Sequence, residues 1–123
     1  MIRKKASLFV LASLLAACHQ APADENVILI NAFRVAPGQE DAALAAWRKA
    51  RDFLQTQPGY LDTRLHKNLD PEGEFLFVNI ARWQSVEDFH AATARMRQAL
   101  PDNRVPGVHA HPGLFQWMAE ESR

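Results

Sequence analysis

The single cysteine of this sequence lies at position 18, ahead of the segments that could fold, so thiol chemistry is not expected of the folded part. Any chemistry there must use histidine, arginine, asparagine, carboxylate and aromatic side chains. Asn31 is the one uncharged polar residue in the apolar segment 27–35. A buried amide without a hydrogen-bond partner is costly. We therefore expect Asn31 either to bond neighbouring backbone or to hold a ligand oxygen in a cleft.

Arg64 and His66 are candidates for acid–base chemistry. In the segment 60–69 they alternate with apolar residues, which places them on one face of a predicted strand together with Tyr60 and Asp62. Two interpretations remain open. Either these residues form an exposed polar row, or His66 acts as a general base near neutral pH while Arg64 stabilises an oxyanion.

Three more histidines lie further along the chain. His90 is on the flank of a predicted helix, where it is either solvated or reaches a cleft as an acid or base or, less favourably, as an axial haem ligand. His109 and His111 would share a strand face and could present two metal ligands, but no third ligand accompanies them, so no metal site is predicted. Trp83 belongs by its spacing to the core and could also line the cavity. Trp83 and His90 are therefore candidate substrate-binding residues.

Hydrophobic periodicity predicts the elements that position these residues. An apolar period of two indicates strands, whereas apolar residues three and four apart indicate amphipathic helices. Ser85 is a suitable helix N-cap, and Asp70-Pro71-Glu72-Gly73 has the composition of a type I turn within a hairpin. The predicted strands cover 27–35, 60–69, 74–83 and part of 109–119, and the predicted helices cover 39–56 and 85–99.

The resulting order, β-α-β-β-α-β, predicts an α+β protein with the ferredoxin-like arrangement, an antiparallel sheet with both helices on one face. The other face of the sheet carries apolar residues that nothing in the same chain covers. Because such a face usually marks an interface, we expect a homodimer that packs sheet to sheet about a twofold axis.

The first 17 residues have the features of a secretory signal, since three basic residues precede a short apolar run over residues 6–17. That run would reach only ~18 Å as a helix, too short to span a bilayer. Leu15-Ala16-Ala17-Cys18 resembles the lipobox of bacterial lipoproteins, in which the cysteine is acylated. The sequence therefore predicts a signal peptide (1–17), a lipidated cysteine with its tether (18–26) and one folded domain (27–119).

Lipid on Cys18 would hold the domain in the cell envelope, and His19 in place of an aspartate implies, by resemblance to Gram-negative sorting, the periplasmic face of the outer membrane. Removal of residues 1–17 leaves 106 residues with 11 basic and 14 acidic side chains, a formal net charge of −3. No basic run survives, so nucleic acid is not an expected partner. The chain has no glycine-rich motif for a dinucleotide or a nucleoside triphosphate.

The sequence resembles the antibiotic biosynthesis monooxygenase (ABM) domains of the dimeric α+β barrel group over about residues 27–119. The resemblance rests on four motifs along the chain. They are Pro37-Gly38 after the first strand, Pro58-Gly59-Tyr60 at the helix exit, Asn79-Ile80-Ala81-Arg82-Trp83 followed by Ser85 and Phe89, and the closing His111-Pro112-Gly113-Leu114-Phe115.

The resemblance implies an oxygenase that needs no cofactor, binds a small aromatic or quinol-type molecule in an apolar cleft, removes a proton and lets the substrate carbanion reduce O₂. Asn31 matches the family's active-site asparagine, and Arg64 and His66 are its expected catalytic partners. Ala92 and Asp102 stand where the haem-degrading branch has a tryptophan and a haem-ligating histidine, which disfavours that branch. The alternative is a non-catalytic ligand-binding or envelope-stress module with the same fold.

Overall fold

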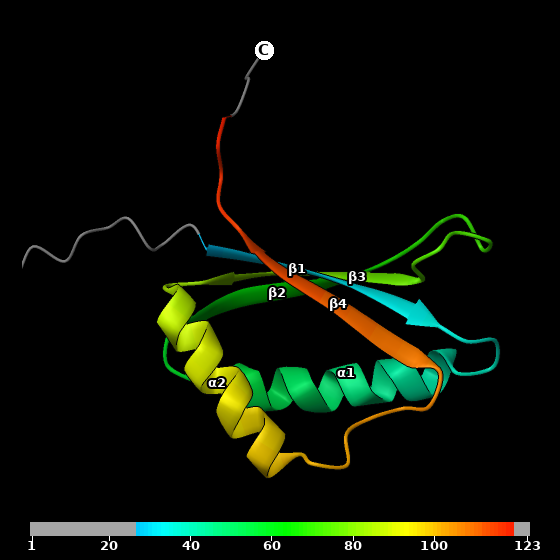
Figure 1. Cartoon of the computed structure of the whole chain (residues 1–123), viewed down its shortest axis with the longest axis horizontal. Coiled ribbons are helices and arrows are strands. Elements are labelled where there is room, and N and C mark those ends of the chain that lie inside the picture. Colours follow the sequence, from blue (N-terminus) through cyan, green and yellow to red (C-terminus); the bar gives the residue numbers. More distant parts are fainter. Residues whose placement is uncertain (1–26, 120–123) are drawn as a thin grey trace, which may run out of the picture.

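The computed structural model describes residues 27–119, and within them the strands and helices follow the predicted order (Figure 1). The expected signal peptide (1–17) and the lipidated Cys18 with its tether (18–26) lie outside the described residues. Within the described part, the elements are β1 (Val27–Val35), α1 (Glu40–Leu54), β2 (Tyr60–Lys67), β3 (Phe77–Trp83), α2 (Val86–Ala99) and β4 (Val108–Phe115). Between residues 27 and 119, no helix is both long and apolar enough to cross a membrane.

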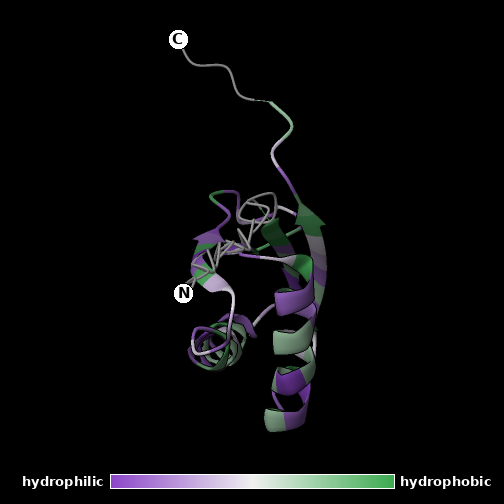
Figure 2. Cartoon of the chain, turned by 90° about the vertical axis from the view of Figure 1, so that its left-hand side faces the viewer, coloured by the Kyte–Doolittle hydropathy of each residue, from purple (hydrophilic) through white to green (hydrophobic). Residues whose placement is uncertain are grey.

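The strands form one antiparallel sheet in the order β2-β3-β1-β4, and both helices lie on the same side of it (Figure 1). Figure 2 shows α1 nearly end-on and α2 side-on, so the two helix axes cross steeply. This arrangement confirms the predicted ferredoxin-like α+β fold.

Several strand boundaries differ from the prediction, and β2, for example, ends at Lys67 rather than at residue 69. β3 begins at Phe77 rather than at residue 74, because residues 74–76 do not continue the regular pairing of the hairpin. The Leu76 amide instead donates to the Phe33 carbonyl of β1 at 3.0 Å. β4 ends at Phe115, opposite Ile28. Since β1 begins only one residue before Ile28, it offers no partner to residues 117–119.

The hydrophobic core lies between the sheet and α2. It contains Trp83 and the fully buried Ala92, whose small side chain lets α2 pack closely on β3. Ser85 caps this helix as predicted, because its Oγ accepts a hydrogen bond from the Asp88 amide at 3.0 Å. α1 buries only Ala43 completely and faces the sheet across an open space described below.

A β-bulge in β2 moves Tyr60 to the face of the sheet that the helices cover. Tyr60 pairs with Trp83 and Asp62 pairs with Arg82, so Leu61 is the extra residue on the bulged strand. The prediction that Tyr60 and Asp62 share a face is therefore wrong, because strict alternation fails where a strand contains an extra residue.

The opposite face of the sheet, called the open face here, has no cover within the described residues. Ile28 and Ile30 of β1 share it with Val78 and Ile80 of β3, and the Ile80 side chain is 39% exposed. At its edge, Phe115 is also exposed. Both faces of β3 are therefore apolar, but the helices of the described chain cover only one of them.

Candidate functional site

A cleft of about 1140 Å³ lies between the helix-covered face of the sheet and the two helices. Its floor is formed by residues of all four strands, including His109 of β4, its sides by α1 and α2, and its end by the loop before β4. The volume slightly exceeds the roughly 300–1,000 Å³ typical of ligand pockets. The cleft therefore has room for a molecule of several fused rings.

Two asparagines face each other on the floor of the cleft. Asn31 of β1 and Asn79 of β3 are direct partners across the strands, and both line the cleft. Asn79 is only 7% exposed, and its Oδ1 accepts a hydrogen bond from the Thr63 hydroxyl at 2.7 Å. Asn31 Oδ1 is buried and has no hydrogen-bond partner. The amide oxygen of Asn79 thus has a hydrogen-bond partner within the fold, whereas that of Asn31 is left as a free acceptor among residues 27–119.

Trp83 is both a core residue and part of the cleft wall, and only 1% of it is exposed. Its indole ring makes edge-to-face contacts with Tyr60 at 5.5 Å and with Phe89 at 5.6 Å between ring centroids. The indole Nε1 is buried and has no hydrogen-bond acceptor. An indole nitrogen can only donate a hydrogen bond, whereas Asn31 Oδ1 can only accept one. The two unpartnered groups are therefore complementary in kind.

Tyr60 adds a phenol to the same wall. Burial raises its pKa above the ordinary value, the nearby Asp62 carboxylate raises it further, and Arg51 partly opposes both effects. The hydroxyl therefore stays neutral at physiological pH and keeps its proton for donation.

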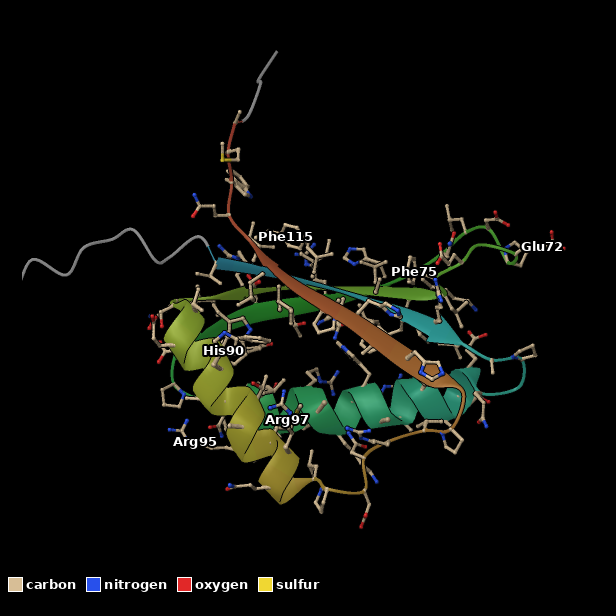
Figure 3. The ribbon with its side chains drawn as sticks, in the orientation of Figure 1. Glu72, Phe75, His90, Arg95, Arg97 and Phe115 are labelled. Carbon is tan, nitrogen blue, oxygen red and sulfur yellow. The ribbon has the colours of Figure 1, made fainter. Side chains whose placement is uncertain are left out.

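His90 of α2 also lines the cleft, although its side chain is exposed. Its ring lies 5.6 Å from the ring of Phe89 between centroids. Figure 3 shows His90 near the end of α2 that packs on the sheet. Its position gives an acid–base group access to the cleft.

Arg64 and His66 do not join this site. They are paired with Ile80 and Val78 of β3, which places both on the open face, and His66 Nδ1 lies 3.2 Å from the Val78 carbonyl. Alternation along β2 sends Thr63 and Leu65 into the cleft instead. The expected grouping of Asn31, Arg64 and His66 is therefore not formed within one chain.

The polar row on the open face exists, and its ion pair joins Asp62 of β2 to Arg82 of β3. Arg82 Nε donates to Asp62 Oδ2 at 2.9 Å. This hydrogen bond, reinforced by the positive charges of Arg82 and Arg64, holds the pKa of Asp62 below its ordinary value. The exposed-row interpretation of Arg64 thus agrees with its surroundings.

Asn79 is the site residue that sequence reasoning missed most plainly. It is an uncharged polar residue inside an otherwise apolar strand, the same criterion that singled out Asn31. Tyr60 was missed because its face was assigned by strict alternation. Arg97 and Arg104, which also line the cleft, have no distinguishing pattern in the sequence.

The residues at this site do not fit the arrangement that the resemblance implies for haem degradation. Ala92 is fully buried on the face of α2 that packs on the sheet, where no space remains for the larger side chain of a tryptophan. Asp102 is exposed and lines a separate small hollow outside the cleft. Between residues 27 and 119, no three histidine, cysteine, aspartate or glutamate side chains gather as a metal site.

Several solved structures share this fold. A protein of Shewanella loihica PV-4, described as a candidate monooxygenase, is 39% identical, with a TM-score of 0.71 over 77% of this chain and 96% of that one. SnoaB, a cofactor-independent oxygenase from Streptomyces nogalater, is 23% identical, with a TM-score of 0.58 over 80% and 96%. The haem degrader MhuD of Mycobacterium tuberculosis is 23% identical, with a TM-score of 0.60 over 78% and 99%.

Comparison with curated proteins gives no significant match. The sequence profile of the family described as antibiotic biosynthesis monooxygenase matches residues 26–100, more than half of the chain. That match includes β1, α1, β2, β3 and α2, the elements that carry the floor and sides of the cleft. The chain therefore belongs to the antibiotic biosynthesis monooxygenase family.

Proposed function

We propose that this protein is a cofactor-independent monooxygenase that oxidises a small aromatic or quinol-type molecule with O₂. The observation that carries the proposal is a pair of buried polar atoms without partners among residues 27–119, the acceptor Asn31 Oδ1 and the donor Trp83 Nε1, on two residues that line one apolar cleft. Buried polar groups are normally hydrogen-bonded, so exceptions call for an explanation. A phenolic ligand supplies one, because a hydroxyl can donate to Asn31 and an oxygen can accept from Trp83.

The reaction balances without an external reductant for a substrate of the anthrone type. Loss of a proton from the activated CH₂ carbon gives a carbanion whose charge is delocalised onto the ring oxygen. One electron passes to O₂, and the resulting radical and superoxide combine to a peroxide. The peroxide takes up a proton and eliminates water, which leaves a carbonyl group. One atom of O₂ enters the product and the other leaves as water.

The residues of the cleft match the demands of these steps. We assign the first proton to His90, a histidine of the cleft lining at the sheet end of α2, with His109 of β4 as the other histidine of that lining. Trp83 Nε1 and the neutral Tyr60 hydroxyl can donate to the oxygen on which negative charge develops. Asn31 Oδ1 can orient the substrate by accepting from its hydroxyl group.

Oxygen uptake with anthrone as substrate tests this proposal. We expect one O₂ consumed for each quinone formed, and one atom of isotopically labelled O₂ in the product. Asn31→Ala and Trp83→Phe should each lower kcat/KM by about 10²-fold, the effect of removing one group that stabilises a transition state. His66→Ala is the control, because His66 lies on the open face. Full activity in both cleft variants would contradict the assignment.

The fold and the shared ancestry support the proposal without deciding the substrate. The 39% identical Shewanella protein is described as a candidate monooxygenase, and SnoaB combines this fold with oxygenase activity that needs no cofactor. The rival hypothesis is a ligand-binding module without catalysis. A ligand that stays bound in stoichiometric amount under O₂, with no product, would favour that module.

We also propose that the protein is an envelope lipoprotein, anchored through lipid on Cys18 at the periplasmic face of the outer membrane. The support is the sequence alone, namely the basic start, the short apolar run and the lipobox-like Leu15-Ala16-Ala17-Cys18. Metabolic labelling with palmitate should mark the protein and should fail for Cys18→Ser. A Cys18→Ser protein that is still labelled and still membrane-bound would overturn the anchor.

A homodimer that packs through the open face completes the proposal. The support is the uncovered apolar surface made by Ile28, Ile30, Val78 and Ile80. Burial of such a face in a twofold interface removes its apolar area from water in both copies. The cleft lies on the other side of the sheet, so substrate access would remain unobstructed.

A further inference from the structure

The charged residues that line the cleft are all of one sign. Arg51, Arg97 and Arg104 belong to its lining, and none of the aspartates or glutamates between residues 27 and 119 does. Arg51 is already engaged, because its guanidinium lies 2.8 Å from the Asp52 carboxylate. In the described part of the chain, no salt bridge involves Arg97 or Arg104. Two guanidinium groups are thus left to interact with a molecule that enters the cleft.

The periodicity of α2 directs Arg97 into the cleft. His90, Thr93 and Arg97 are three and four residues apart, so they share one edge of the helix, and all three line the cleft. Figure 3 shows Arg97 on the side of α2 towards α1 and Arg95 on the opposite side. Arg97 follows Phe89 by eight residues, which corresponds to ~12 Å along the axis. The cationic end of the cleft is therefore well separated from the aromatic end at Phe89.

The loop that carries Arg104 is tied to the first half of the chain. Asn103 Nδ2 donates to the Ala46 carbonyl of α1 at 2.9 Å. At the other end of the loop, the Gly107 carbonyl accepts from the Ala36 amide at 2.8 Å. These bonds fix the backbone on both sides of Arg104 before any ligand arrives. A pre-organised group loses less conformational freedom on binding than a mobile one.

From these observations we infer that the substrate is an aromatic acid, whose ring system lies against Trp83 and Phe89 and whose carboxylate binds Arg97 and Arg104. A guanidinium group matches a carboxylate in charge and in its two parallel hydrogen bonds. The absence of acidic lining residues removes the repulsion that an anion would otherwise meet. This assignment rests on the proposed function for the aromatic half of the ligand, and it adds the charged half.

Arg97 also has a structural explanation, because it lies in the last turn of α2, where a cation stabilises the helix dipole. That role predicts a loss of stability when the charge is removed, and it predicts no selectivity between ligands. Arg104 lies outside any helix and has no such role. The two explanations therefore separate when binding and thermal stability are measured on the same variants.

The test compares two probes that differ by one carboxylate, hydroxynaphthoate and naphthol, by calorimetric titration of the purified protein. We expect hydroxynaphthoate to bind about tenfold more tightly, and rising salt to reduce this preference. In Arg97→Gln/Arg104→Gln the two probes should bind equally, with naphthol affinity unchanged. The control is Arg48→Gln, which removes an exposed charge of α1 outside the cleft lining and should keep the full preference.

Two outcomes would overturn the inference: equal binding of the two probes to the unmodified protein, or a preference that persists in the double variant. If that variant fails to fold, Arg104→Gln alone should still halve the preference or reduce it further. Oxygen uptake is measured separately. Selective binding without turnover would refute the oxygenase and leave the anion site standing, whereas turnover of neutral substrates without selectivity would refute only the anion site.

Discussion

Replacing Asn31 with leucine should make the protein more stable and less active at the same time. Asn31 Oδ1 is buried without a partner, and an unsatisfied buried polar group costs about 1–3 kcal/mol. Leucine has a similar shape, adds buried apolar surface and has room to adjust, because the position borders the cleft. We expect a gain of about 1–2 kcal/mol in the free energy of unfolding.

For a domain of this size, each kcal/mol should raise Tm by roughly 4–8 °C. Scanning calorimetry measures this gain, and oxygen uptake with anthrone should fall by about 10²-fold. The matched control is Asn79→Leu on the facing strand. There the same change removes the acceptor of the Thr63 hydroxyl and should lower stability by about 1–3 kcal/mol.

The opposite signs of the two changes are the critical result. If Asn31→Leu lowers Tm as much as Asn79→Leu does, then Asn31 has a structural partner and the free acceptor is not real. If Asn31→Leu raises Tm but keeps full activity, then the acceptor is free and has no part in the reaction. Either result would refute the reasoning behind the proposed site.

Three further predictions concern the surroundings of the cleft. Gly38 has φ 84° and Gly59 has φ 85°, but only at Gly59 would an added Cβ collide with a side chain of α2. Urea unfolding should therefore show a loss of stability of about 1–2 kcal/mol for Gly38→Ala and a larger loss for Gly59→Ala. Equal losses would contradict the packing described. Tyr60 is the only tyrosine, so tyrosinate absorbance reports it alone and should rise only above pH ~10. Because a raised folded-state pKa favours the fold while the phenol is neutral, this contribution is present below pH ~10 and lost as pH rises further, and a transition below pH 10 would contradict the burial of Tyr60. Ile80→Arg on the open face should convert a dimer to monomers, as measured by light scattering. Leu69→Arg, in the exposed hairpin loop, is the control and should leave the dimer intact. A dimer that survives Ile80→Arg would exclude this interface.

The sequence predicts the fold well because the order of elements follows from periods that extend over many residues. The helix around Trp47 and the alternation from Phe77 to Trp83 each repeat their pattern several times, and local errors do not change the order. The predicted N-cap at Ser85 depends on a single local interaction of known geometry, and it is confirmed.

The site was harder to predict because it depends on which face each side chain occupies. One extra residue, Leu61, moves Tyr60 into the cleft, and no feature of the sequence announces a bulge there. The residue types of Arg64 and His66 suit acid–base chemistry, but the face that they occupy does not follow from residue type. The alternation that places Thr63 towards the helices places both of them on the open face. Asn79 could have been found, since it repeats the pattern of Asn31 on the neighbouring strand.

Trp83 has two roles that constrain how this protein can diverge. Its indole ring belongs to the buried core, and its nitrogen is a buried donor without an acceptor among the described residues. Substitutions there would affect the chemistry and lower the stability of the domain together, so selection can rarely accept them. Exposed positions such as Arg97 and Arg104 carry no comparable penalty. New substrate preferences should therefore arise at the rim of the cleft during evolution, while its floor remains constant.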